Sequence, residues 1–82
     1  MVENAVIQAF NVAKDKMDSL AIVCGILDIS NSYAYKAMAD GEISLPCALM
    51  LEVMTDGQVC WRDLCPKVGD RVKAVEDRVS EY

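Results

Sequence analysis

Polar and aromatic side chains able to contact DNA follow one another at helical spacing after residue 30. Asn31 and Ser32 begin a predicted helix, and Tyr35 and Lys36 follow one turn later. Asn and Ser can hydrogen-bond base edges or phosphates, Tyr can stack on a sugar or touch a thymine methyl group, and Lys can pair with a phosphate or guanine. An ordinary solvated helix face is the simpler interpretation, but an outward Tyr35 weakens it. Together with Ser30 just before the helix, these residues form the predicted DNA-binding set.

The cysteines are the second group with possible chemistry. Cys60 and Cys65 have the spacing C-x4-C, but no second pair lies nearby and the chain contains no His. Cys24 and Cys47 fall on apolar helix faces. The pattern favours small buried hydrophobic residues over a zinc site, so we predict neither a metal nor another cofactor.

Glu52 is a carboxylate within an otherwise apolar predicted helix. No nucleophile or base partner surrounds it in the sequence, so a structural hydrogen bond or an ion pair, such as one with Arg62, is preferred to catalysis. The sequence therefore predicts a protein that is not an enzyme and has no small-molecule substrate.

The elements that must position the first group are two short helices joined by a tight turn. Residues 20–27 are almost wholly apolar, which predicts a buried helix, and residues 31–39 alternate small apolar and polar residues at helical spacing. Asp28 begins the turn and is one of the few residues besides Gly that tolerates a left-handed conformation. Ser30 is the predicted N-cap of the second helix and Gly41 its stop. This is the plan of a helix-turn-helix.

A first helix is predicted over residues 2–17, and Asp18 or Ser19 is a suitable N-cap for the helix that follows. Its apolar stripe consists of Val2, Val6, Ala9, Phe10, Ala13 and Met17.

A fourth helix begins at Ser44 and Pro46 and ends at Gly57. Its mostly buried residues are predicted to be Ala48, Leu49, Leu51, Val53 and Met54. Residues 60–64 form a single helical turn that Pro66 closes.

The composition changes from Val68 onward. Apolar residues spaced four, three, four and three apart form a heptad-like seam among mixed charges; they are Val68, Val72, Val75, Val79 and Tyr82. The seam folds back on the domain or pairs with a second subunit, and we favour a homodimer because the preceding helices can already close a core. The predicted division is a DNA-binding domain of residues 1–67 and a C-terminal amphipathic helix of residues 68–82.

Charge and composition limit the function classes. The 82 residues suit one domain, and 54% are hydrophobic with few aromatics, which suits helices packed on helices. The net charge of −5 argues against a broad basic surface. Lys14, Lys16 and Lys36 are the candidates for one small basic face, with Lys14 and Lys16 as possible phosphate contacts; Arg62 and Lys67 are possible flanks.

The sequence predicts a cytoplasmic protein with reduced thiols. Its first residues lack the positive charge and cleavage site of a signal peptide. The longest uncharged apolar run, residues 19–27, is far shorter than the roughly 20 residues that cross a bilayer. We therefore expect no membrane association.

Two segments resemble a known family. Residues 29–38 resemble the turn and recognition helix of phage Cro-like repressors. Residues 45–66 are similar to the YdaS antitoxin/Cro-like proteins, in which a helix that reads roughly P-x-x-A-x-x-x-E-x-x-T-x-G precedes V-[ST]-x-x-[DE]-L-x-P. The matching positions here are Pro46, Ala48, Glu52, Thr55, Gly57, Val59, Asp63, Leu64 and Pro66.

The chain also departs from that family. Asp28 stands where a turn Gly is usual, Tyr35 where Trp is common, and Cys65 where Arg is usual. Asp40 and Glu42, in the long loop after the second helix of the motif, would repel phosphate.

The resemblance implies a small all-α, Cro/lambda-repressor-like domain of about five helices followed by the C-terminal amphipathic helix. It also implies a phage or prophage transcriptional regulator, a repressor or an activator, that binds palindromic operator DNA as a dimer. The alternative is a helix-turn-helix module that has lost DNA affinity and binds a protein through its acidic surface or its C-terminal helix.

Overall fold

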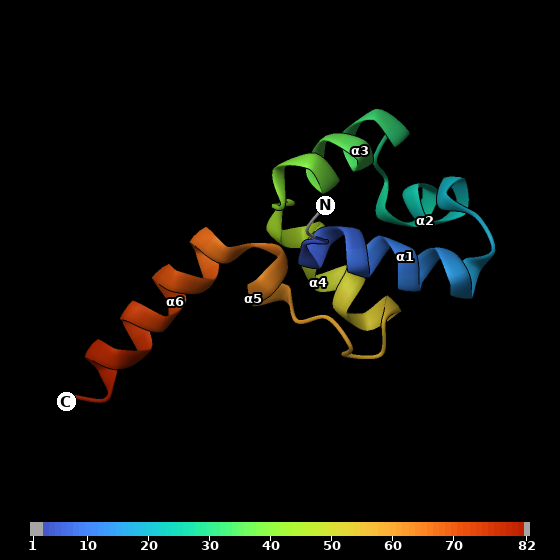
Figure 1. The fold of residues 1–82 in the computed structure, drawn as a ribbon. Helices are drawn as coiled ribbons and strands as arrows, with labels where there is room; N and C mark the ends of the chain where they lie inside the picture. Colours follow the sequence, from blue (N-terminus) through green and yellow to red (C-terminus); the bar gives the residue numbers. More distant parts are fainter. Residues whose placement is uncertain (1–2, 82) are drawn as a thin grey trace.

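The computed structural model describes residues 3–81 and is helical throughout, with no strand in that range (Figure 1). The predicted all-α fold of five helices and a C-terminal helix is confirmed. The helices are α1 (Ala5–Met17), α2 (Leu20–Leu27), α3 (Asn31–Asp40), α4 (Leu45–Met54), α5 (Trp61–Leu64) and α6 (Pro66–Val79). None of the described helices is both long and apolar enough to cross a membrane.

Helix α1 is the centre of the domain and packs against α2, α3, α4 and α5. Its buried face is the predicted stripe, from Val6 through Phe10 to Ala13. The helix begins later than predicted, because the Asn4 side chain caps it by accepting a hydrogen bond from the backbone N–H of Ile7 at 2.9 Å. The predicted stripe residue Val2 lies outside the described residues.

The turn between α2 and α3 has the predicted form. Ser19 caps α2, and Asp28 adopts the left-handed conformation (φ 58°, ψ 47°) that lets the chain reverse. Ser30 caps α3, and Gly41 ends it with a positive φ of 72°. The chain thus presents α3 beside α1 and α2, as a helix-turn-helix requires (Figure 1).

The prediction that α2 and α4 are largely buried is wrong for their outer faces. Ile22 and Ile26 on α2 and Leu49 on α4 are about half exposed, and Val53 is 76% exposed. Both helices are apolar on nearly every side, so sequence periodicity cannot distinguish the side that meets α1 from the side that meets solvent.

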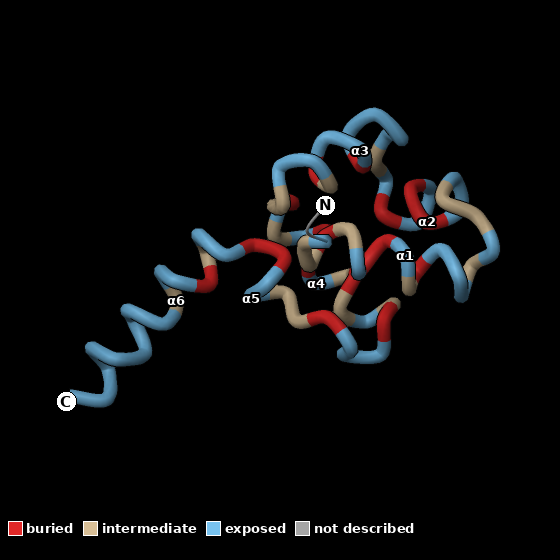
Figure 2. Tube along the Cα trace, in the orientation of Figure 1, coloured by how far each residue is buried: buried red, intermediate tan, exposed pale blue. Residues whose placement is uncertain are grey.

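The C-terminal helix starts earlier than predicted, so the predicted domain boundary after residue 67 falls within α6. Pro66 occupies the first turn of α6 instead of only closing α5. Gly69 is buried against α5, where an added Cβ would lie 3.2 Å from the carbonyl oxygen of Arg62. This close approach fixes the base of α6, whereas the remainder extends away from the domain and is exposed (Figure 2). Of the predicted seam, Val68 packs against the core and Val72 is half-buried, whereas Val75 and Val79 are exposed and do not fold back onto the domain. The last seam residue, Tyr82, lies outside the described residues.

Glu52 has a structural role, as predicted, but with a different partner. Its Oε1 accepts a hydrogen bond from the backbone N–H of Trp61 at 3.2 Å and so ties α4 to α5. The Arg62 guanidinium pairs with Glu76 of α6 at 2.6 Å, and this hydrogen bond raises the pKa of Arg62.

Candidate nucleic-acid interface

The outward face of α3 carries the side chains predicted from the sequence. Asn31, Ser32, Tyr35 and Lys36 are all exposed, and Tyr35 is 61% exposed. The opposite face packs on the domain through small buried residues, chiefly Ala34. An exposed aromatic ring next to a lysine, on a helix whose other face is packed on the domain, is able to contact a nucleic acid duplex.

Ser30 has a structural contact of its own. It is exposed, but its hydroxyl oxygen accepts a hydrogen bond from the backbone N–H of Tyr33 at 3.0 Å. This contact is an N-cap, which satisfies one of the free amides at the start of α3. Contact of Ser30 with DNA remains a prediction, whereas capping is its observed role.

Replacing Ser30 with alanine is expected to lower the free energy of unfolding by about 1 kcal/mol, because the first turn of α3 loses its cap. Ser32→Ala is the matched control, since Ser32 is an exposed residue one position inside the helix. Urea denaturation followed by circular dichroism measures both. Equal losses for the two variants would contradict the capping role of Ser30.

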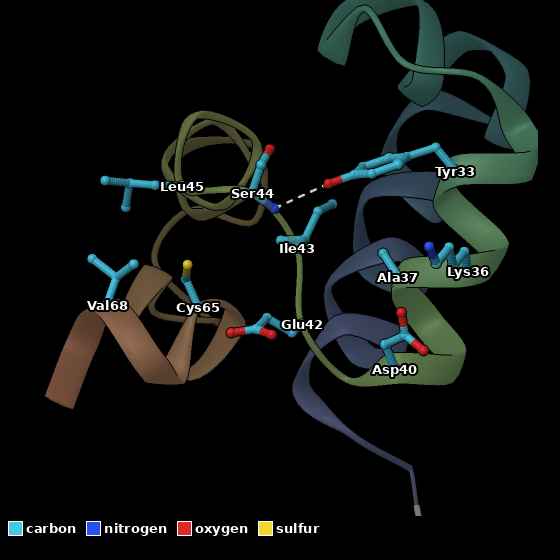
Figure 3. Close-up of a pocket in the computed structure, with 10 residues that line it drawn as sticks. All are labelled: Tyr33, Lys36, Ala37, Asp40, Glu42, Ile43, Ser44, Leu45, Cys65 and Val68. Carbon is cyan, nitrogen blue, oxygen red and sulfur yellow. Dashed lines mark hydrogen bonds between the residues drawn. The ribbon is translucent and has the colours of Figure 1, made fainter. Parts of the chain in front are cut away.

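Tyr33 makes a contact that the helical spacing of the sequence does not predict. Its hydroxyl accepts a hydrogen bond from the backbone N–H of Ser44 at 3.2 Å, so that the ring bridges α3 and the start of α4 (Figure 3). Asn4 makes a second tie, donating from Nδ2 to the carbonyl oxygen of Met38 at 2.7 Å. These two contacts fix the position of α3, and neither follows from periodicity because both join residues far apart in sequence.

A hollow of about 390 Å³ lies between α3, the loop before α4 and the base of α6 (Figure 3). Lys36, Asp40 and Glu42 contribute its charged lining. The Glu42 carboxylate lies 3.7 Å from the Lys67 ammonium. The acidic groups thus gather toward the C-terminal end of α3, and the side chains suited to DNA lie from its N-terminus to its middle.

The predicted basic face is only partly available. Lys14 and Lys16 lie on the last turn of α1, but the Lys16 ammonium is paired with the Asp56 carboxylate in the turn after α4. That pairing lowers the positive charge that Lys16 can offer to a phosphate.

The four cysteines are free thiols, and three of them are buried. Burial raises the pKa of the Cys24 thiol, which keeps it protonated. Within residues 3–81 no group of His, Cys, Asp and Glu is arranged to hold a metal ion.

Sequence reasoning also missed an apolar groove between α2 and α4. Its lining residues are Ile26, Leu49, Met50, Val53 and Met54, and its volume is about 350 Å³. The signal in the sequence was the near absence of polar residues from both helices, which leaves apolar surface that a single core cannot cover.

No protein-family model, curated protein or solved structure matches this chain.

Proposed function

We propose that the protein is a sequence-specific, DNA-binding transcriptional regulator of the Cro/YdaS-like type, with α3 in the major groove. The observation that supports this proposal is the exposed face of α3, which carries Asn31, Ser32, Tyr35 and Lys36 on the second helix of a helix-turn-helix. Such a regulator acts in the cytoplasm on an operator, and the two-fold symmetry of a homodimer would match a palindromic site.

Electrostatics determine the character of the binding. The net charge of −5 argues against a broad cationic surface, so we expect the affinity to come from few contacts. Lys36 is the main one of these contacts, and a dimer brings two copies of it to the DNA. We therefore expect binding that is weak for one protomer, stronger for a dimer and readily reduced by salt.

Lys36→Ala is expected to weaken binding to the DNA upstream of the protein's own gene and to lower the slope of log K against log salt by about one per bound protomer, and so by about two for a dimer. Tyr35→Ala is expected to weaken binding with little change in that slope, because it removes a contact but no charge. Fluorescence anisotropy over a series of salt concentrations measures both effects.

Lys73→Ala is the matched control, since Lys73 is an exposed lysine on α6, away from α3. The assignment of the α3 face would be wrong if Lys36→Ala and Tyr35→Ala bound this DNA as the parent protein does.

A protein-binding module without DNA affinity is the second candidate. Asp28, Asp40 and Glu42 lie at the two ends of α3, and their carboxylates oppose the approach of phosphate. This candidate predicts no binding to the upstream DNA even at low salt, together with a stable complex with another protein.

A further inference from the structure

Two apolar surfaces of this chain lack a partner within the described residues. One is the α2/α4 groove, formed by Ile26, Leu49, Met50, Val53 and Met54. Met50 and Met54 also pack against the core and form the base of the groove. Leu49 and Val53 are exposed at the edge of the groove.

The other surface is the α6 stripe, formed by Val72, Val75 and Val79. These residues recur at three- and four-residue steps on one side of a 14-residue helix, and Val75 and Val79 are 60% and 65% exposed. The helix is about 21 Å long at 1.5 Å per residue. It extends away from α2 and α4, so the stripe does not meet the groove of its own chain (Figure 1).

We propose that the α2/α4 groove binds the α6 stripe of a second copy of this chain, and that the two copies exchange their α6 helices reciprocally. An amphipathic helix laid in an apolar groove is a common recognition mode, with anchors at the spacing that Val72, Val75 and Val79 have. Reciprocal exchange uses each stripe and each groove once, so the assembly closes as a two-fold dimer.

Charge complementarity favours a second copy as the occupant. Helix α6 holds four of the chain's eight basic residues and three of its thirteen acidic ones, which gives it a net charge of +1. The domain body, residues 1–65, carries the other four basic side chains and nine acidic ones, a net charge of −5; the remaining acidic residue, Glu81, follows α6. Transfer of α6 onto the body of another copy therefore joins a weakly positive helix to a strongly negative domain, whereas pairing of two domain bodies would place like charges together.

Pairing of two α6 stripes as a coiled coil is a less favourable arrangement than docking of α6 in the groove. Two heptads bury little surface, and helices of this length gain most of their stability from packing on a larger body. Glu76 flanks the stripe and could form an ion pair with an arginine of the facing helix in a coiled coil. It is already paired with Arg62 of its own chain. Such a coil would also leave the α2/α4 groove exposed.

The exchange is tested with two double variants of the full chain. The helix variant carries Val75→Asp and Val79→Asp, and the groove variant carries Ile26→Asp and Val53→Asp. All four side chains are at least half exposed, so the fold should survive, and circular dichroism verifies this. The matched controls are Ala74→Asp on α6 and Gln58→Asp after α4, both at exposed positions.

Mass in solution is measured by sedimentation equilibrium without DNA, at protein concentrations from about 1 μM to about 1 mM. The parent and the controls are expected to dimerise, and each double variant alone is expected to bind itself at least about 100-fold more weakly, since hot-spot anchors are lost. An equimolar mixture of the two variants is expected to form a heterodimer more tightly than either variant binds itself, because one stripe and one groove remain intact.

Other outcomes would overturn the exchange. A groove variant that dimerises like the parent would indicate pairing of α6 with α6, and a helix variant that does so would indicate pairing of grooves. A monomeric parent, a mixture without complementation, or growth beyond a dimer would each exclude the reciprocal arrangement. The inference extends the proposed homodimer, but the mass measurement contains no DNA, so a failure of DNA binding would leave it unaffected.

Discussion

Replacement of Phe10 with alanine is expected to lower the free energy of unfolding by about 3–5 kcal/mol, because a large cavity replaces the ring. Phe10 is 1% exposed and lies in the middle of α1, which contacts four other helices. Small domains have a free energy of unfolding of only about 5–15 kcal/mol, so this one substitution should remove much of the stability.

Urea denaturation measures the loss, and Tyr35→Ala is the matched control because it truncates an aromatic side chain that is exposed. We expect the control to change the free energy of unfolding by less than about 0.5 kcal/mol. Similar losses in the two variants would show that the packing around α1 is not what stabilises the fold.

Helix ends were predictable from the sequence where an N-cap or a left-handed residue determines them. Ser30 and Gly41 delimit α3 through a cap and a left-handed residue, and both act within a few residues of their own position. Asp28 likewise reverses the chain through its own φ angle. Caps and left-handed residues act locally, so residue type and position were sufficient to find these helix ends.

The directions of the helices were not predictable in the same way. Helices α2 and α4 are apolar nearly all round, and the sequence does not say which side meets α1; this is why Leu49 and Val53 were wrongly expected to be buried. The path of α6 depends on the close contact of Gly69 with α5, a tertiary feature.

In the candidate site, too, local features were predictable from the sequence and contacts between distant residues were not. The outward face of α3 followed from helical spacing, because one side of that helix is small and apolar and the other is polar. The contact of Tyr33 with Ser44 and the pairing of Lys16 with Asp56 join residues 11 and 40 positions apart. Periodicity within one helix carries no information about such pairs.

The packing of α3 leads to a second large effect. Ala34→Leu is expected to lower the free energy of unfolding by about 1–3 kcal/mol, because a fully buried alanine gives way to a side chain with three more carbon atoms. The added volume lies between α3 and the domain, so the helix must shift outward. If α3 reads DNA, that shift moves Tyr35 and Lys36 together and should reduce affinity for the upstream DNA more than removal of Lys36 alone.

The comparison is made at a temperature and denaturant concentration where the variant remains folded by circular dichroism. Ala74→Leu is the matched control, since the same substitution falls at an exposed helical position on α6, away from α3. We expect the control to leave both stability and DNA affinity close to those of the parent. Loss of stability with unchanged DNA affinity in Ala34→Leu would show that DNA binding does not depend on the position of α3 and would contradict α3 as the helix that contacts DNA. Loss of both properties would support that assignment.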